Sequence, residues 1–342
     1  MTKLTIKEIL KGTTPGKMQT VGIMQVIPLI SEIDDDRFVS PSMEGKVGTE
    51  GYGSMMFENT SSKNMIIPNH TAYMVKQAAQ NHAMTHAGIL AAKSKKIYNT
   101  AACIQQSQAG YITPDMHEIS ILPFALREHA LGLRNTSSYN KLWPAISEFN
   151  RRCGLADTGG HLEKFYDHFN KELEEFAAEF ETVPNQVGAI VLIMGKVVGI
   201  DRTPSKAYWS SIWRGLIRGC YGALAIQFEK ENAINANQIN SVRVPLGKNV
   251  NSIADIEAEL SKAELTQDEF AKSTVRELID EEFEVVKEES VGTYERNNIS
   301  NKQLIGQIIA DEIGLVVYAS LVTKDKWFRT DSKLTKIKQF DI

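Results

Sequence analysis

The stretch that decides the fold is QVGAIVLIMGKVVGIDRTPSKAYWSSIWRGLIRGCYGALAIQF, residues 186–228. Its first part, residues 186–201, has the pattern of a β-hairpin, in which two apolar runs flank Gly195-Lys196. Glycine readily adopts the positive φ that a two-residue hairpin turn requires. The stretch therefore predicts a pair of antiparallel strands, followed by a short link and a helix for which Ser205 is the expected N-cap.

The helix expected over about residues 206–228 has a broad apolar face and a face of small residues. Each interior glycine costs about 0.5–1 kcal/mol relative to alanine, so three of them on one helix predict the close approach of another backbone. We therefore predict that this is the central helix of the fold. Arg214 and Arg218, one turn apart, are either an anion site or a solvent-facing edge. The apolar face comprises Trp209, Ile212, Trp213, Leu216, Ile217, Cys220, Tyr221, Leu224, Ala225 and Phe228, and the small face Ser211, Gly215, Gly219 and Gly222.

Other segments extend the prediction in both directions. Residues 161–180 place aromatic and aliphatic side chains at steps of three and four, which predicts a surface helix. Residues 254–289 carry thirteen acidic and four basic residues, and a Thr266–Glu269 capping box favours a solvated helical hairpin there. Residues 73–92 fit either a helix or a strand-loop passage. Short runs rich in β-formers predict strands at 20–30, 52–57, 64–67, 97–106, 304–310 and 315–322.

These elements predict an α+β fold with a mixed, largely antiparallel sheet packed by long amphipathic helices. We expect one domain over residues 1–342. Its parts are a β-rich region at 1–130, helices at 137–182 and 205–230, an acidic helical insertion at 254–289 and closing strands at 303–323.

Composition excludes several classes of protein. The 342 residues are 42% hydrophobic and 23% charged, which is typical of a globular chain. The formal net charge is −4, so we do not expect a nucleic acid as the partner. The longest apolar run is too short to span a membrane. The N-terminus lacks the apolar core of a signal peptide, and Cys103, Cys153 and Cys220 lie far apart. We therefore expect reduced thiols and a cytoplasmic protein, in the host cytoplasm if it is phage-encoded.

One segment departs from the acidic background. Residues 59–114, here called the acid-free window, contain no Asp or Glu but five lysines. The window also carries many amide side chains, which suit the directional hydrogen bonds of a ribose or base, while lysine offsets phosphate charge. We predict a continuous positive surface with a concavity. Two alternatives remain open: an internal sheet with few exposed positions, or a basic face that docks on acidic helices of the same chain.

The window also holds the side chains that could bind metal or act as a nucleophile. His82 and His86, four residues apart, would share one side of a helix, as zinc ligands do, but no third ligand is nearby in the sequence. We therefore predict no metal site and leave any cofactor open. Cys103 has the surroundings of a strand interior, where a cysteine is usually a small apolar residue.

Several stretches resemble a known family. They are MVKQ (74–77), NTAACIQQSQ (99–108), VGAIVLIMGKVVGID (187–201), WSSIWRGLIRGCYGAL (209–224) and GLVVYASLV (314–322). Together they resemble the ARG-and-rhodanese-phosphatase-superfamily-associated protein domain family. The sequence departs from the family pattern at Gln105, where an acidic residue is common, so the resemblance carries no catalytic acid over to this position.

The resemblance implies association with ADP-ribose- and NAD-linked gene neighbourhoods, often in phage or conflict systems. We therefore expect binding or processing of an anionic nucleotide of the ADP-ribose or NAD class. The alternative is a non-enzymatic structural or interaction protein, forming homo-oligomers or binding a host protein. The expected ligand-binding residues are Lys76, Gln77, Asn99, Gln105 and Gln108.

Overall fold

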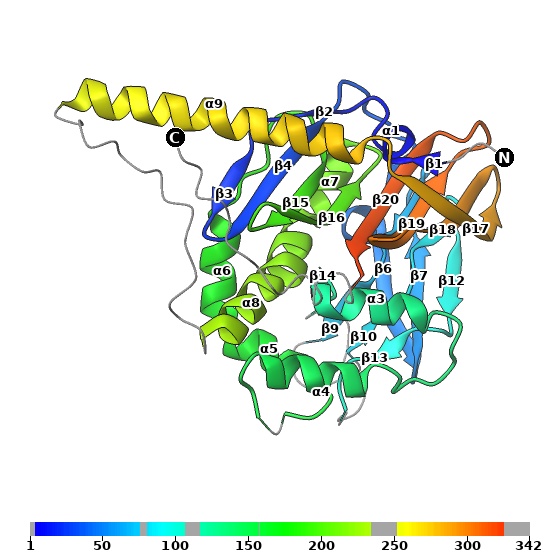
Figure 1. Ribbon diagram of the computed structural model, residues 1–342. Coiled ribbons are helices and arrows are strands. Elements are labelled where there is room, and N and C mark those ends of the chain that lie inside the picture. Colours follow the sequence, from blue (N-terminus) through cyan, green and yellow to red (C-terminus); the bar gives the residue numbers. More distant parts are fainter. Residues whose placement is uncertain (1–3, 76–80, 107–116, 157, 234–251, 325–342) are drawn as a thin grey trace.

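A large antiparallel sheet forms the centre of the molecule, with helices on both of its faces (Figure 1). The computed structural model describes residues 4–75, 81–106, 117–156, 158–233 and 252–324. The strand order is β1 (Leu4–Thr5), β17 (Glu282–Val291), β18 (Tyr294–Ser300), β19 (Leu304–Ala310), β20 (Val316–Thr323), β16 (Lys196–Arg202), β15 (Gln186–Ile193), β4 (Met24–Ile30) and β2 (Thr14–Pro15), with β3 (Gln19–Val21) also on β4. This confirms the predicted α+β class.

The predicted hairpin is β15–β16, but its turn lies one residue earlier than expected. Ile193 pairs with Lys196, so Met194 and Gly195 form the turn. Both have positive φ, 50° and 77°, as a type I′ turn requires. Met194 tolerates this conformation because its amide donates to Ile23 O at 2.7 Å.

Alternate residues of β15 fill two separate cores. Val191 and Ile193 point to the inner face, where they meet Trp209 of the central helix. Ile190 and Leu192 point to the outer face. The outer face is covered by α1 (Ile6–Ile9) and by the C-terminal half of α9 (Ile253–Leu278), which Figure 1 shows crossing above the sheet. Because both faces are covered, β15 is buried along its whole length and is almost entirely apolar.

The predicted central helix is confirmed and has an unexpected middle. It runs as α7 (Lys206–Arg214), a π-helical segment η1 (Gly215–Gly222) and α8 (Ala223–Ala233). The Ser205 hydroxyl accepts from the Tyr208 amide at 3.2 Å, as expected of an N-cap. A Cβ on Gly219 would lie 2.1 Å from Ser120 Oγ and 2.9 Å from Ile121 O. The small face therefore packs directly on strand β14 (His117–Ile121), as predicted.

Three smaller sheets from the N-terminal part of the chain lie beside the large one (Figure 1). They enclose a core of their own and share another with the helices α3–α6. The sheets are β13 (Ala102–Cys103)–β10 (His82–Ala83)–β9 (Thr71–Val75)–β14, β11 (Gly88–Leu90)–β8 (Asn64–Ile67)–β5 (Phe38–Val39) and β12 (Lys95–Tyr98)–β7 (Ser54–Asn59)–β6 (Gly45–Gly51). The remaining helices are α2 (Pro41–Glu44), α3 (Phe124–Gly132), α4 (Trp143–Arg152), α5 (Glu163–His168) and α6 (Asn170–Ala178).

Three of the predicted elements need correction. The helix expected at 161–180 breaks at Phe169, whose φ and ψ of −102° and 20° separate α5 from α6. The strand expected at 97–106 is divided between β12 and β13, which belong to different sheets. The acidic segment is not a helical hairpin: after α9 the chain forms β17, because this segment pairs along β18.

The start of α9 also differs from the expectation. Ser252 is its N-cap, and its hydroxyl accepts from the Asp255 amide at 3.2 Å. Thr266 lies inside the helix, where its hydroxyl donates to Lys262 O. In the described part of the chain, no helix is both long and apolar enough to cross a membrane.

Candidate functional site

The structure describes two of the five predicted ligand-binding residues. Asn99 is exposed just beyond the end of β12, and its Oδ1 accepts from Ser54 Oγ at 3.0 Å. Gln105 follows β13 and is only 3% exposed, and its Oε1 is buried without a hydrogen-bond partner. Lys76, Gln77 and Gln108 lie outside the described residues.

The lysines of the acid-free window are matched by acceptors elsewhere in the chain. Lys63 pairs with Asp36 at 3.2 Å and Lys95 with Glu50 at 3.6 Å. Lys96 pairs with Glu289 of β17 at 2.5 Å. Most described residues between 64 and 90 are buried. Three of the four described window lysines therefore lie beside carboxylates, which interrupt the predicted continuous positive surface, while Lys93 donates to Thr60 O. The part of the window between residues 64 and 90 is mostly internal.

The paired histidines do not share a helix face. His82 is in β10, and its Nε2 accepts from the Gly53 amide at 3.0 Å. His86 lies beyond β10, with its Nδ1 2.6 Å from Ala87 O. Cys103 is fully buried and its thiol donates to Gln105 O at 2.9 Å. Within the described ranges, no three or more His, Cys, Asp or Glu side chains are grouped as a metal site would need.

A row of three aromatic rings reaches the surface beside Asn99. Tyr52 and Tyr139 have ring centroids 5.2 Å apart, and Tyr139 and Trp143 5.6 Å apart. Tyr52, in the turn between β6 and β7, is 61% exposed and Tyr139 is 39% exposed. Gly53 makes this contact possible, because a Cβ there would lie 2.9 Å from Tyr139 Cβ. We call these three residues the aromatic row.

Backbone contacts hold the aromatic row next to the Gln105 segment. The Cys103 amide donates to Tyr139 O at 2.7 Å. Gln106 Oε1 accepts from the Gly160 amide at 2.7 Å, and Gly160 packs on Trp143, where a Cβ would lie 2.7 Å from Trp143 Cβ. The indole Nε1 of Trp143 is buried without a partner. Buried polar atoms are rarely left unpaired, so this surface carries unused hydrogen-bonding capacity.

In the sequence, Lys141 lies between two residues of the aromatic row, Tyr139 and Trp143. Lys141 is half-buried, and its Nζ donates to Thr100 O at 2.7 Å and to Thr136 O at 2.5 Å. Burial lowers the pKa of this amine to about 8. Thr100 directly follows Asn99, so the amine, the exposed amide and the aromatic rings belong to one surface.

A second polar cluster lies inside the molecule and was missed by sequence reasoning. Asp201, Ser320, Gln307 and Asn298 face one another across β16, β20, β19 and β18. We call these four residues the polar row. Ser320 Oγ donates to Asp201 Oδ1 at 2.6 Å, and Gln307 Nε2 donates to Asn298 Oδ1 at 2.6 Å.

Side chains from two other elements close over Asp201. Tyr221 of η1 donates to Asp201 Oδ2 at 2.7 Å. Arg127 of α3 is fully buried, 3.5 Å from Asp201 Oδ1, and its Nε donates to His70 Nδ1 at 3.2 Å. Burial, aided by Arg127, holds the pKa of His70 well below its usual range. No sequence signal joins these residues, because they come from four distant segments.

The Arg214–Arg218 pair is not a free anion site. Arg218 is 6% exposed and donates from Nε to Glu174 Oε1 at 2.7 Å. A second carboxylate, Glu118, lies 3.4 Å from it, and Arg214 also pairs with Glu174. Carboxylates therefore already occupy the donors that an anion would use.

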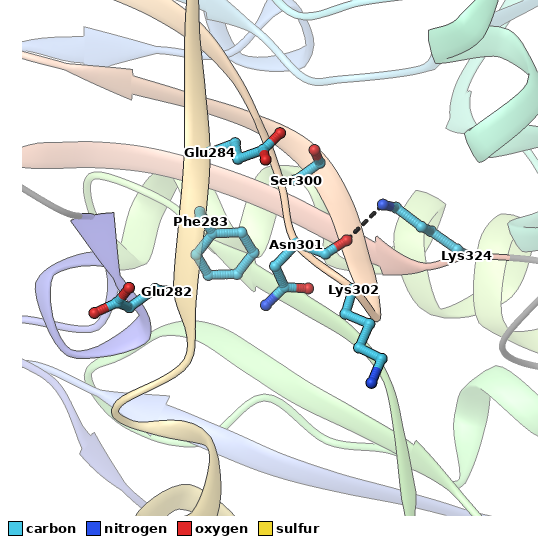
Figure 2. Close-up of a pocket in the computed structure, with 7 residues that line it drawn as sticks. All are labelled: Glu282, Phe283, Glu284, Ser300, Asn301, Lys302 and Lys324. Carbon is cyan, nitrogen blue, oxygen red and sulfur yellow. Dashed lines mark hydrogen bonds between the residues drawn. The ribbon is translucent and has the colours of Figure 1, made fainter.

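A cavity of about 570 Å³ opens where β17 begins and β18 ends (Figure 2). It carries both signs of charge, and Lys324 Nζ donates to Asn301 O at 2.5 Å. Neither of the two described ligand-binding candidates, Asn99 and Gln105, lines it. The lining residues are Glu282, Phe283, Glu284, Ser300, Asn301, Lys302 and Lys324.

Comparison with known proteins gives one match. The family model of the ARG and Rhodanese-Phosphatase-superfamily-associated Protein domain matches residues 12–310. No curated protein and no solved structure matches the chain. The family match covers most of the chain, including the aromatic row and all of the polar row except Ser320, and it agrees with the resemblance seen in the motifs. The chain therefore belongs to the family of the ARG and Rhodanese-Phosphatase-superfamily-associated Protein domain.

Proposed function

We propose that this protein binds an anionic nucleotide of the ADP-ribose or NAD class on the surface around the aromatic row. The observation that carries the proposal is the partly exposed row Tyr52–Tyr139–Trp143 beside Asn99. Aromatic rings at a surface are stacking platforms for a base, and each stacked base contributes about 1–3 kcal/mol.

The groups around the row supply the other contacts that a nucleotide needs. Asn99 offers an exposed amide for a ribose or base edge, and Gln105 Oε1 has no competing donor. The Lys141 amine is the nearest cation in the sequence to Tyr139 and is a partner for phosphate. Lys76, Gln77 and Gln108 remain part of the proposal on sequence grounds.

Isothermal titration with ADP-ribose and NAD tests the proposal directly. Tyr52→Leu and Tyr139→Leu keep apolar bulk but remove the aromatic face, so we expect affinity to fall by about 5- to 150-fold, the equivalent of one stacked base. Ile313→Ala is the matched control, since Ile313 is 83% exposed and lies in the β19–β20 turn. A wild-type protein that takes up neither nucleotide at millimolar concentration contradicts the proposal.

Gln105→Met separates a binding role from a structural role. Because Gln105 Oε1 has no partner to lose, we expect the free energy of unfolding to change by less than about 1 kcal/mol. Nucleotide affinity should nevertheless fall. A large loss of stability with unchanged affinity would instead assign Gln105 to the core.

A second candidate function, self-association, is favoured by the outer edge of β17. Among the described residues, β1 covers this edge only at Glu282 and Phe283. Farther along the strand, Val285 and Val286 are 46% and 58% exposed. If the β17 strands of two copies pair antiparallel, with the two-fold axis between Val285 and Val286, Glu284 of one copy lies opposite Lys287 of the other. Sedimentation velocity tests it: Val286→Lys should dissociate an oligomer, and a wild-type monomer at all salt concentrations removes this candidate.

A further inference from the structure

Lys141 is held differently from Lys63, Lys95 and Lys96, although Lys93 of the window also donates to a backbone carbonyl, Thr60 O. Lys63, Lys95 and Lys96 each contact a carboxylate. Within the described ranges, Lys141 makes no ion pair, and its Nζ contacts two backbone carbonyls instead, Thr100 O and Thr136 O. Since no carboxylate offsets the cost of partial burial, the charged form is destabilised and the pKa of Lys141 falls to about 8.

The two carbonyls also fix the orientation of the neutral amine. A neutral lysine has two N–H bonds and one lone pair. With both N–H bonds donated to Thr100 O and Thr136 O, the lone pair occupies the remaining tetrahedral direction and needs no proton transfer before it can attack an electrophile. Lysines that form imines with carbonyl substrates are activated by this kind of desolvation.

The position of Lys141 indicates which electrophile could reach it. The residue lies between Tyr139 and Trp143 in the sequence, and its acceptor residue Thr100 follows the exposed Asn99. The Cys103 amide also donates to Tyr139 O at 2.7 Å, so the segment that holds the amine packs beside the aromatic row. A nucleotide that ends in a free ribose carries an anomeric carbon that is an aldehyde in the open-chain form.

We propose that Lys141 is a nucleophilic amine that forms an imine with the aldehyde carbon of a ring-opened sugar phosphate. The choice of this sugar as the substrate rests on the proposed function. The Nζ lone pair forms the C–N bond while the C=O π pair moves to oxygen, which takes a proton. Loss of one water molecule then gives the C=N bond. Cyanoborohydride supplied in the assay donates hydride to that carbon and leaves a stable secondary amine.

Reductive methylation with formaldehyde and cyanoborohydride measures the reactivity of the amine alone. Lys46, whose side chain is 67% exposed and paired with Glu58, is the internal reference. At pH 7 we expect Lys141 to react on the order of tenfold faster or more, because a larger fraction of its amine is unprotonated. Its rate should level off above pH 8. Equal rates for the two lysines overturn the proposal.

Reaction with sugars then tests the substrate class. ADP-ribose and ribose 5-phosphate with cyanoborohydride should modify the Lys141 peptide selectively, and Lys141→Arg should lose the adduct. NAD has no free anomeric carbon, so it should form no adduct but should slow the labelling of Lys141. Sugar adducts spread over exposed lysines overturn the inference. Selective labelling by ribose 5-phosphate without protection by NAD supports the reactive amine and counts against the proposed nucleotide function.

Discussion

At Gly219 the central helix lies closer to the small sheets than at its other described glycines. Any side chain there must displace Ser120, since a Cβ would lie 2.1 Å from its Oγ and 2.9 Å from the Ile121 carbonyl. The backbone oxygen cannot move without disturbing β14. The composition of the helix predicted this contact, because three glycines on one face have no other physical use in a helix.

We expect Gly219→Ala to lower the free energy of unfolding by about 1–3 kcal/mol through overpacking. Gly132 at the end of α3 is the matched control, because nothing lies within 4 Å of its Cβ position. Gly132→Ala should be neutral or slightly stabilising. Urea denaturation of both variants measures the difference, and equal stabilities would mean that β14 does not press on the helix.

His86 links the stability of the interior to pH. Burial, then the charge of Arg296, lowers its pKa from 6.5 to about 4. The unfolded chain therefore takes up a proton between about pH 6.5 and 4 that the folded protein excludes, and stability must fall as pH falls through this window. At about 1.4 kcal/mol per pKa unit, the loss approaches about 3.5 kcal/mol once the pH has fallen to about 4.

Urea denaturation at pH 7.5, 6 and 5 measures this loss. His86→Gln should flatten the dependence, whereas the exposed His129→Gln should leave it unchanged. His70 is shifted in the same direction, so some dependence should remain in the His86 variant. Identical profiles for the wild type and His86→Gln would show that His86 is not the titrating group.

At the scale of elements, sequence periodicity predicted the helices better than it predicted the segments next to them in the chain. The apolar steps in 206–228 gave the central helix and its buried face. They gave no sign of η1, because a π-helix differs from an α-helix in backbone hydrogen bonding while residues keep similar neighbours. The β17 segment was predicted as helix because its acidic composition continues that of α9, and only its pairing with β18 makes it a strand.

The two halves of α9 should differ in their sensitivity to mutation. Ala271 is 2% exposed and packs in the outer core, whereas Leu265 is 68% exposed. Ala271→Leu should cost about 1–3 kcal/mol, because a larger side chain overpacks the contact with the sheet. Leu265→Ala should stay within about 0.5 kcal/mol of wild type. Thermal and urea unfolding test both, and a large loss at Leu265 would place a partner on that half of the helix.

At the scale of the whole molecule, the candidate surface could be predicted only in part. The amide density of the window pointed to Asn99 and Gln105, because such side chains are numerous within a short stretch. The aromatic row joins Tyr52 to Tyr139, eighty-seven positions away. The polar row joins β16 to strands more than ninety residues later. Such long-range contacts follow from sheet topology, and no local pattern encodes them.

The ion pair of Arg127 and Asp201 connects α3, η1, the large sheet and the turn that carries His70. Both residues are buried, so removing one charge leaves the other without compensation, which typically costs 3–5 kcal/mol. We therefore expect about this loss for Asp201→Asn and for Arg127→Met. Because each variant removes the same interaction, the double variant should lose clearly less than the sum of the two.

The cycle is measured by urea unfolding, followed in parallel by tryptophan fluorescence and far-ultraviolet circular dichroism. Arg151→Met with Glu148→Gln is the matched surface cycle, since their side chains are 70% and 49% exposed and exposed ion pairs contribute little to stability. If residues 1–342 form one domain, as predicted, both probes should follow a single transition in the wild type. Each interior variant should then shift both probes together, because the ion pair joins the large sheet to the N-terminal region. Strictly additive costs, or two transitions already separate in the wild type, would show that Arg127 and Asp201 do not couple these regions.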